Sequence, residues 1–220
     1  ELKTIDWRYN WRGALPVEDS PVVLVTIDDQ SFESLPGRWP WPRYYYAEVI
    51  ENLTQAGAKV IGVDVILDVP DEVNKGSDQK MAEAIQQSGR VVLAGKLEYG
   101  GRGRSYAKLG TPIPVLLAAD SSWGLVSMEA DRDGMYRQYV IAQQYQEEIL
   151  PSFGLQVLKK YLDIPSSDTM RIQEGIIHLA DLRIPLSSEG MLRINFAGPA
   201  GTFPQYSFDT VIDDEQFSLK

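Results

Sequence analysis

The chain has 220 residues, of which 44% are hydrophobic and 24% are charged. This composition is ordinary for a folded globular protein and excludes disordered and collagen-like classes. The apolar runs fall far short of a membrane span, and a formal net charge of -10 argues against nucleic acid as a partner. Cysteine is absent, which excludes disulfides, thiolate metal sites and cysteine nucleophiles.

The sequence shows no sign of a boundary between domains. We find no repeat, no low-complexity tract and no convincing linker, so we expect a single domain over residues 1–220. The chain begins with Glu1 rather than Met and shows no signal peptide. We therefore expect a fragment of a longer protein or a processed product.

The first half alternates strand and helix patterns. Its apolar, β-branched runs predict strands buried on both faces, and the segments between them carry apolar side chains at helical spacing. The expected elements are a strand at Pro21–Asp28, a helix at Tyr44–Ala56 that ends before Gly57, a strand at Lys59–Leu67, a helix at Asp78–Ser88 and a strand at Val91–Ala94. This order is typical of right-handed crossovers in a parallel sheet.

The second half predicts shorter strands. Trp123–Glu129 and Tyr136–Tyr145 predict two strands joined by the turn Asp131–Gly134. Leu150–Leu162 predicts a helix with Pro151 in its first turn. Three short strands and a last helix are expected at Ile176–Leu179, Leu182–Pro185, Met191–Phe196 and Phe208–Ile212. We therefore expect an α/β fold, with a mainly parallel central sheet and crossover helices in the first half and antiparallel strand additions in the second half.

Two acids follow or end the predicted strands of the first half. Asp28 and Asp64 lie at or near the carboxyl ends of strands that we expect to be parallel neighbours, and ligands bind at that edge of open α/β sheets. With Asp29 and Asp68 nearby, they would hold a hard cation or position a polar ligand. The alternative is that these acids cap turns and helix N-termini.

A stiff loop, Arg38-Trp-Pro-Trp-Pro-Arg43, precedes the first predicted helix. Its two indoles, Trp39 and Trp41, and its two guanidinium groups, Arg38 and Arg43, would form one lip of a pocket through stacking or cation–π contacts. In the alternative interpretation, the two indoles plug the end of the sheet and Arg43 pairs with Asp28 or Asp64.

Other motifs lack the partners that their chemistry requires. Asp131–Arg137 has the start of a calcium loop without its bidentate acid, and Gly198–Gly201 is not followed by a phosphate-binding lysine. His178 is the only histidine and lies in an apolar run, so the sequence lacks the residues that a catalytic triad needs. We expect no catalytic residue, no metal site and no cofactor.

Several motifs occur together in a recognisable order. They are Ile27–Phe32, Arg38–Arg43, Ala56–Asp64, Asp131–Arg137 and Arg193–Phe203. Over nearly the whole chain, this set closely resembles the type-two CHASE domain, the cyclase/histidine-kinase-associated sensory extracellular domain.

The resemblance implies a non-enzymatic, extracytoplasmic input domain of a bacterial transmembrane receptor, periplasmic or extracellular. Such domains follow an N-terminal membrane helix and control cytoplasmic outputs such as adenylate cyclases, histidine kinases of two-component systems and other kinases or cyclases. Leu2–Arg8 would then emerge from the first membrane helix and Phe217–Lys220 would lead towards the next. The family has no generally established ligand, so the matches at Asp28, Arg43, Asp64 and Asp133 assign no role to these residues.

Three hypotheses follow. In the first, an unknown small molecule or ion binds at the sheet edge and biases the membrane helices and output domain of a homodimeric receptor. Its candidate ligand-binding residues are Asp28, Asp29, Arg43, Asp64, Trp39 and Trp41. In the second, the domain is a ligand-independent dimerisation or protein-interaction module. The third, a metal-dependent hydrolase that uses the two strand-end acids, lacks a cationic phosphate clamp.

Overall fold

The computed structural model describes residues 2–17, 20–99, 106–119, 121–128, 130–165, 168, 170–187 and 190–212. The chain divides into two compact units. The first, here the terminal unit, combines Glu1–Trp39 with Ile194–Lys220, and the second, here the central unit, is Pro40–Arg193. Compact units of one chain can belong to one folding domain, so the single domain over 1–220 stays a prediction.

The central unit is built on a parallel sheet around β3 (Val91–Tyr99). β2 (Ile61–Ile66) and β5 (Ser122–Leu125) pair with β3 in parallel on its two sides, with Ile61 opposite Val91 and Val92 opposite Ser122. β4 (Tyr106–Gly110) pairs antiparallel with the second half of β3. The expected parallel pairing of the strands at Lys59–Leu67 and Val91–Ala94 is therefore confirmed.

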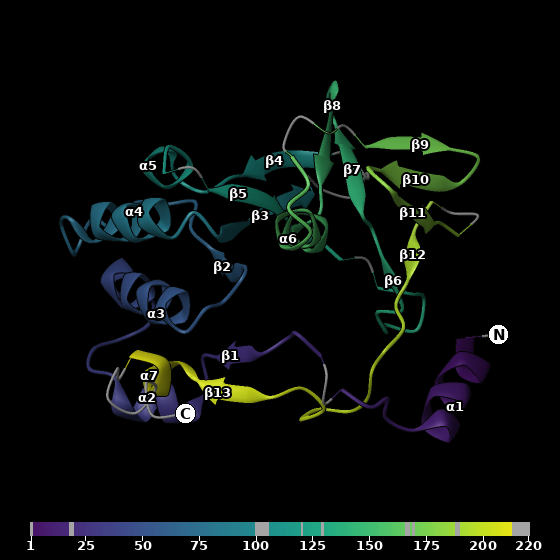
Figure 1. The fold of residues 1–220 in the computed structure, drawn as a ribbon, viewed down its shortest axis with the longest axis horizontal. Coiled ribbons are helices and arrows are strands. Elements are labelled where there is room, and N and C mark those ends of the chain that lie inside the picture. The colour runs from purple at the N-terminus through teal and green to yellow at the C-terminus, as the bar shows by residue number, and fades with distance from the viewer. Residues whose placement is uncertain are drawn as a thin grey trace. The chain divides into compact units, whose positions relative to one another are not determined.

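Helices cover both faces of this sheet. α3 (Arg43–Gln55) and α4 (Ser77–Ser88) lie on one face, and α6 (Phe153–Tyr161) lies on the other (Figure 1). The short α5 (Pro114–Leu117) packs near α4. The first four residues of β3 are at most 1% exposed, which confirms the sequence-based expectation of a strand buried on both faces.

α3 and α4 end at the glycines that the sequence predicts, and α3 buries the side chains that its helical spacing predicts. Gly57, just after α3, has a φ of 88° and Gly89, just after α4, has a φ of 62°. Glycine adopts this left-handed backbone without a steric penalty, so it ends a helix where other residues are strained. Tyr46 and Ile50, four positions apart on α3, are 4% and 1% exposed, as the helical spacing predicts.

The remainder of the central unit consists of small antiparallel sheets. They are the hairpin β7 (Ala142–Tyr145) with β8 (Glu148–Pro151), the meander β9 (Arg171–Gln173), β10 (Ile176–Leu179) and β11 (Leu182–Pro185), and the pair β6 (Gln138–Tyr139) with β12 (Leu192–Arg193). A small core joins the meander to α6 through Ile177, Leu179 and Leu155. The fold class is thus confirmed, with parallel strands first and antiparallel additions afterwards.

Two local expectations for this half are wrong. Pro151 lies in β8 rather than in the first turn of α6, because Ser152 caps the helix by accepting a hydrogen bond from the Leu155 amide at 3.2 Å. The segments on either side of the turn Asp131–Gly134 do form strands, but β5 pairs with β3, while β6 pairs with β12. Glu129 and Phe217–Lys220 lie outside the described residues.

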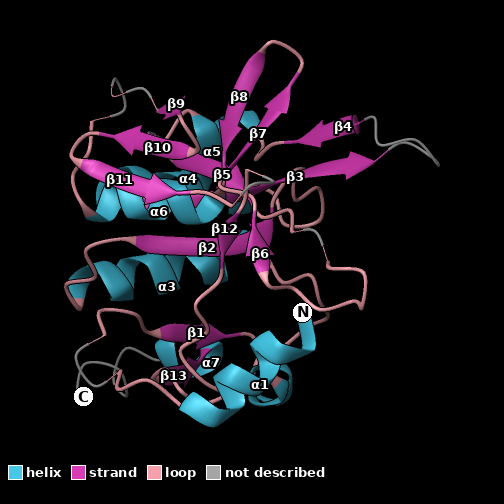
Figure 2. Cartoon of the chain, turned by 90° about the vertical axis from the view of Figure 1, so that its right-hand side faces the viewer, coloured by secondary structure: helices cyan, strands magenta, loops and turns pink. Residues whose placement is uncertain are grey.

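The terminal unit joins the first and last segments of the chain. β1 (Leu24–Thr26) pairs in parallel with β13 (Gln205–Ser207) (Figure 2). α2 (Asp29–Ser34) lies beside α7 (Phe208–Ile212) (Figure 1). α1 (Leu2–Arg12) contacts the segment that enters this unit from β12, because the Tyr9 hydroxyl donates to the Ile194 carbonyl at 2.7 Å. No helix among the described residues is both long and apolar enough to cross a bilayer.

The prediction that Pro21–Asp28 forms the first strand of the central sheet is wrong. β1 has three residues and pairs with β13, whereas β2 belongs to the sheet of the central unit. Val22, Val23 and Leu24 are 45%, 52% and 43% exposed, so this run is not buried on both faces. A β-branched run favours an extended backbone, but it does not specify which strand becomes its partner.

Candidate functional site

Arg43 lies at the carboxyl edge of the central sheet, where α3 and α4 begin. Its Nε atom is 3.4 Å from the Asp78 carboxylate in the first turn of α4, and its Nη2 group donates to the Val69 carbonyl at 2.8 Å. The second Asp78 oxygen accepts the Asp71 amide at 2.9 Å. Arg43 therefore ties the start of α3 to the β2–α4 loop and to α4, and neither Asp28 nor Asp64 is its ion-pair partner.

The loop beside Arg43 is organised around Asp71. Burial alone would raise the pKa of Asp71, but hydrogen bonds from the backbone and side chain of Asn74 and from Ser77, together with the Arg43 charge, hold it below its ordinary value. The carboxylate is thus engaged within its own loop. At this edge, Arg43, Asp71 and Asp78 contact one another and their own loop.

The two tryptophans of the stiff loop have different environments. Trp41 is 1% exposed and packs edge-to-face with Tyr45, with ring centroids 6.5 Å apart. Trp39 is 45% exposed, and its ring contacts Phe32 in the terminal unit. Trp41 is therefore a core residue of the central unit.

Asp64 and Asp68 differ in their surroundings. Asp64 is exposed and lies within a register irregularity of β2 between Val63 and Ile66. Asp68 forms an ion pair with Lys96 at 3.2 Å, and hydrogen bonds to Glu98 and Asp68 raise the pKa of Lys96 above its ordinary value. Of these two acids, Asp64 is the one that the described contacts leave open to solvent.

Asp28 is the N-cap of α2 in the terminal unit. Its carboxylate accepts the Ser31 amide at 3.1 Å, the Ser31 hydroxyl at 2.9 Å and the Ser207 hydroxyl at 2.6 Å. The Ser207 hydrogen bond is the main reason why the pKa of Asp28 falls to about 2, against an opposing effect of burial. Asp29 follows as an exposed acid in the first turn of α2, so both acids stabilise the positive end of this helix.

The expected pairing of Asp28 with Asp64 on neighbouring strands is wrong. Asp28 follows β1, which pairs with β13, and Asp64 lies in β2, which pairs with β3. The basis for a two-carboxylate metal or hydrolase site formed by these residues is therefore removed. Among the residues that the structure describes, no three acids or histidines gather as they would around a metal ion.

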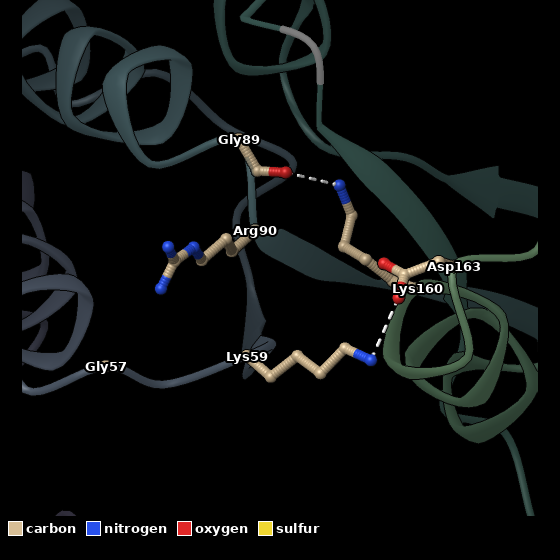
Figure 3. Close-up of a pocket in the computed structure, with 6 residues that line it drawn as sticks. All are labelled: Gly57, Lys59, Gly89, Arg90, Lys160 and Asp163. Carbon is tan, nitrogen blue, oxygen red and sulfur yellow. Dashed lines mark hydrogen bonds and ion pairs between the residues drawn. The ribbon is translucent and has the colours of Figure 1, made fainter.

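A cavity of about 500 Å³ opens at the opposite, amino-terminal edge of the central sheet (Figure 3). It is lined by Gly57, Lys59, Gly89, Arg90, Lys160 and Asp163. Lys59 and Arg90 immediately precede β2 and β3, and Lys160 comes from the last turn of α6. A second cavity, of about 490 Å³, lies over the start of α4 beside Tyr44, Lys75 and Lys80.

The cations of the first cavity are held near the ends of three helices. Arg90 Nη1 donates to the Ala58 carbonyl at 2.7 Å after α3, and Lys160 Nζ donates to the Gly89 carbonyl at 2.8 Å after α4. Lys59 pairs with Asp163 beyond α6 at 2.9 Å. Cations are favoured at helix C-termini, where the carbonyl groups leave a partial negative charge.

The sequence-based prediction missed this cavity because it placed the ligand site at the carboxyl edge of the sheet. A signal was present: a cation stands between a helix-ending glycine and a buried strand twice, in Gly57-Ala-Lys59 and in Gly89-Arg90. Such a repeat brings two cations to the same edge of a parallel sheet.

Comparison with protein families decides the assignment. The family model of the CHASE2 domain matches residues 1–220, the whole chain. The chain belongs to the CHASE2 domain family. CHASE2 domains are sensory extracellular domains of signalling receptors, so the extracytoplasmic location and sensory class are those expected from the motifs. No curated protein and no solved structure gives a significant match.

One family motif of this CHASE2 domain has a clear structural explanation. Arg137, 3% exposed, donates from Nη1 to Asp131 at 2.8 Å and to Asp133 at 2.9 Å, and from Nη2 to Asp133 at 3.0 Å. Gly134 completes the turn with a φ of 82°. The hydrogen bond from Arg137 lowers the pKa of Asp133. Asp131–Arg137 is therefore a turn closed around a buried guanidinium.

Proposed function

We propose that this CHASE2 domain is the extracytoplasmic input module of a bacterial transmembrane receptor and regulates a cytoplasmic cyclase or kinase of the same parent chain. The whole-chain family match carries the proposal. The domain itself catalyses no reaction in this view, and enzymatic activity belongs to the output domain.

The arrangement of the chain supports a route for the signal. The terminal unit combines the first and last segments, and the central unit is inserted between Trp39 and Ile194. A stimulus that binds the central unit acts on the terminal unit through these two chain connections. A ligand shifts output only if it prefers one arrangement over another, and a preference of about 1–3 kcal/mol is enough for a measurable response.

The test is a reversible crosslink in the full-length receptor. The domain contains no cysteine, and Leu24 of β1 stands opposite Gln205 of β13. In Leu24→Cys/Gln205→Cys, oxidation locks the two segments of the terminal unit together, and we expect the cyclase or kinase output in membranes to change and to recover on reduction.

A matched cysteine pair separates this effect from oxidation itself. His178 and Arg183 are opposite one another in the β10–β11 hairpin, and a disulfide there constrains only the central unit locally. Unchanged output on complete oxidation of the β1–β13 pair, in a receptor whose output is active, would reject transmission through the terminal unit.

Homodimerisation is the second candidate function, and one feature of α1 favours it. Trp7 and Trp11 are 66% and 81% exposed, and their rings stack with centroids 6.3 Å apart and planes inclined by 7°. Exposed aromatic clusters of this kind mark interaction surfaces, and a second copy of the chain would bury them. We expect a concentration-dependent mass in sedimentation equilibrium that is lost in Trp7→Ser/Trp11→Ser and kept in Trp39→Ser. A monomer at all concentrations would exclude this function.

A further inference from the structure

The geometry of the amino-edge cavity points to a ligand class. We propose that this cavity, lined by Lys59, Arg90 and Lys160, binds a small organic dianion whose two carboxylate groups are separated by a short chain. The inference deepens the proposed sensory function by naming a ligand class for it. The binding itself is a property of the central unit and does not depend on any output domain.

Charge is the first argument. Three cationic side chains and one carboxylate, Asp163, line the cavity, whereas the whole chain has a net charge of -10. The surplus of positive charge is therefore local. A volume of about 500 Å³ is within the range of small-molecule sites.

The cations also retain unused hydrogen-bond donors. Arg90 has five N–H donors and gives one to the Ala58 carbonyl, and Lys160 has three and gives one to the Gly89 carbonyl. These main-chain contacts hold both side chains at the cavity. A ligand then finds them already ordered, which lowers the entropy lost on binding.

The positions of the charges favour two separated acidic groups. In Figure 3, the Lys160 ammonium lies beside Gly89 and the Lys59 ammonium lies beside Asp163, whereas the Arg90 guanidinium points away from both lysines. One carboxylate of a dicarboxylate would contact one of the lysines while the second contacts Arg90. A compact anion reaches fewer of these separated donors than a dicarboxylate does.

Asp163 is the internal competitor of such a ligand. Its carboxylate pairs with Lys59 at 2.9 Å, and the two side chains are 77% and 52% exposed. Exposed pairs of this kind are weak, so a carboxylate ligand displaces Asp163 at little cost. Asp163 has a φ of 54°, a backbone region in which asparagine is well tolerated, so Asp163→Asn removes the charge without straining the chain.

The experiment is calorimetric titration of the purified domain at constant ionic strength with succinate, acetate and inorganic phosphate. We expect succinate to bind more tightly than acetate or phosphate. Arg90→Gln should weaken succinate binding by about tenfold, as expected for loss of a charged hydrogen bond. Asp163→Asn should tighten it by about threefold, the value of a weak exposed ion pair.

Two controls keep the test decisive. Lys75→Gln makes the same charge change at the second cavity and should leave succinate binding unchanged, and Arg90→Lys retains the charge if Arg90→Gln does not fold. No heat with succinate at tens of millimolar, equal affinity for acetate or phosphate, or weaker binding in Asp163→Asn would overturn the proposal. Each of these results leaves the receptor crosslink experiment unaffected, so the two proposals fail separately.

Discussion

Replacement of Arg43 by methionine tests whether this residue stabilises the fold or is available to a ligand. The Arg43 and Asp78 side chains are 11% and 18% exposed, and they are joined by a 3.4 Å contact. Removing one partner of a buried ion pair costs about 3–5 kcal/mol, because the remaining charge is left without compensation. Asp78 keeps the Asp71 amide and the positive end of α4, so we expect the free energy of unfolding to fall by about 3 kcal/mol.

The measurement is urea unfolding followed by circular dichroism for Arg43→Met, Asp78→Asn and the double variant. Since the two side chains share one interaction, we expect the double variant to be more stable than the sum of the single losses predicts, by about 1–3 kcal/mol. Arg38→Met is the control. Arg38 is exposed at the other end of the same loop, and its replacement should change stability by less than about 0.5 kcal/mol.

The reasoning is refuted if Arg43→Met costs less than about 1 kcal/mol or if the two single losses are additive. Either result would show that Arg43 is not held as a structural ion pair. It would then return to the set of ligand-binding candidates at the carboxyl edge.

Two further predictions concern packing and pH. In Gly124→Ala, the new methyl carbon would lie 2.5 Å from the Ser152 carbonyl oxygen, and because backbone cannot move aside we expect a loss of about 3 kcal/mol in urea unfolding. The pKa of Asp28 is about 2 in the folded chain against an ordinary 3.8, so its stabilisation is complete above about pH 5 and is lost as the pH falls through about 2. Ser207→Ala raises this pKa, and its stability deficit should be constant from about pH 5 to 7 and close between about pH 4 and 2.

Each of these has its own check. Gly62→Ala also introduces a close contact, 2.9 Å from the Phe153 ring, but a side chain can shift, so about 1 kcal/mol is expected. Equal losses at both glycines would contradict the distinction between backbone and side-chain neighbours. For Asp28, carboxyl NMR titration reads its pKa directly, and an unchanged value in Ser207→Ala would show that this hydroxyl does not hold the carboxylate ionised.

Much of the central unit was predictable from local patterns. The helices at Arg43–Gln55 and Ser77–Ser88 and the strands at Ile61–Ile66 and Val91–Tyr99 lie where apolar periodicity and helix-ending glycines place them. Periodicity and backbone preference act over a few neighbouring residues, so they can be read from the chain itself. Pro151 was assigned to the wrong element because proline is common in the first turn of a helix, whereas here it ends β8 and Ser152 caps α6.

The candidate site was less predictable, because it depends on which elements become neighbours. Arg43 and the strand-end acids were the candidates taken from the sequence, but the ion-pair partner of Arg43 is Asp78. The cations of the amino-edge cavity come from two loops and a distant helix. Their convergence is visible only when Lys160 of α6 is placed beside Gly89.

The sequence alone determined the fold class, the order of the main elements and the membership of a sensory family, because periodicity, turn residues and motif order are properties of the chain. Tertiary structure decided that β1 pairs with β13, so that Asp28 follows a strand of one sheet while Asp64 lies in a strand of another. Thr26, at the end of β1, bonds to Tyr206, 180 positions away. A contact at that separation depends on the sum of many packing and hydrogen-bond energies, and no local pattern encodes the choice of partner.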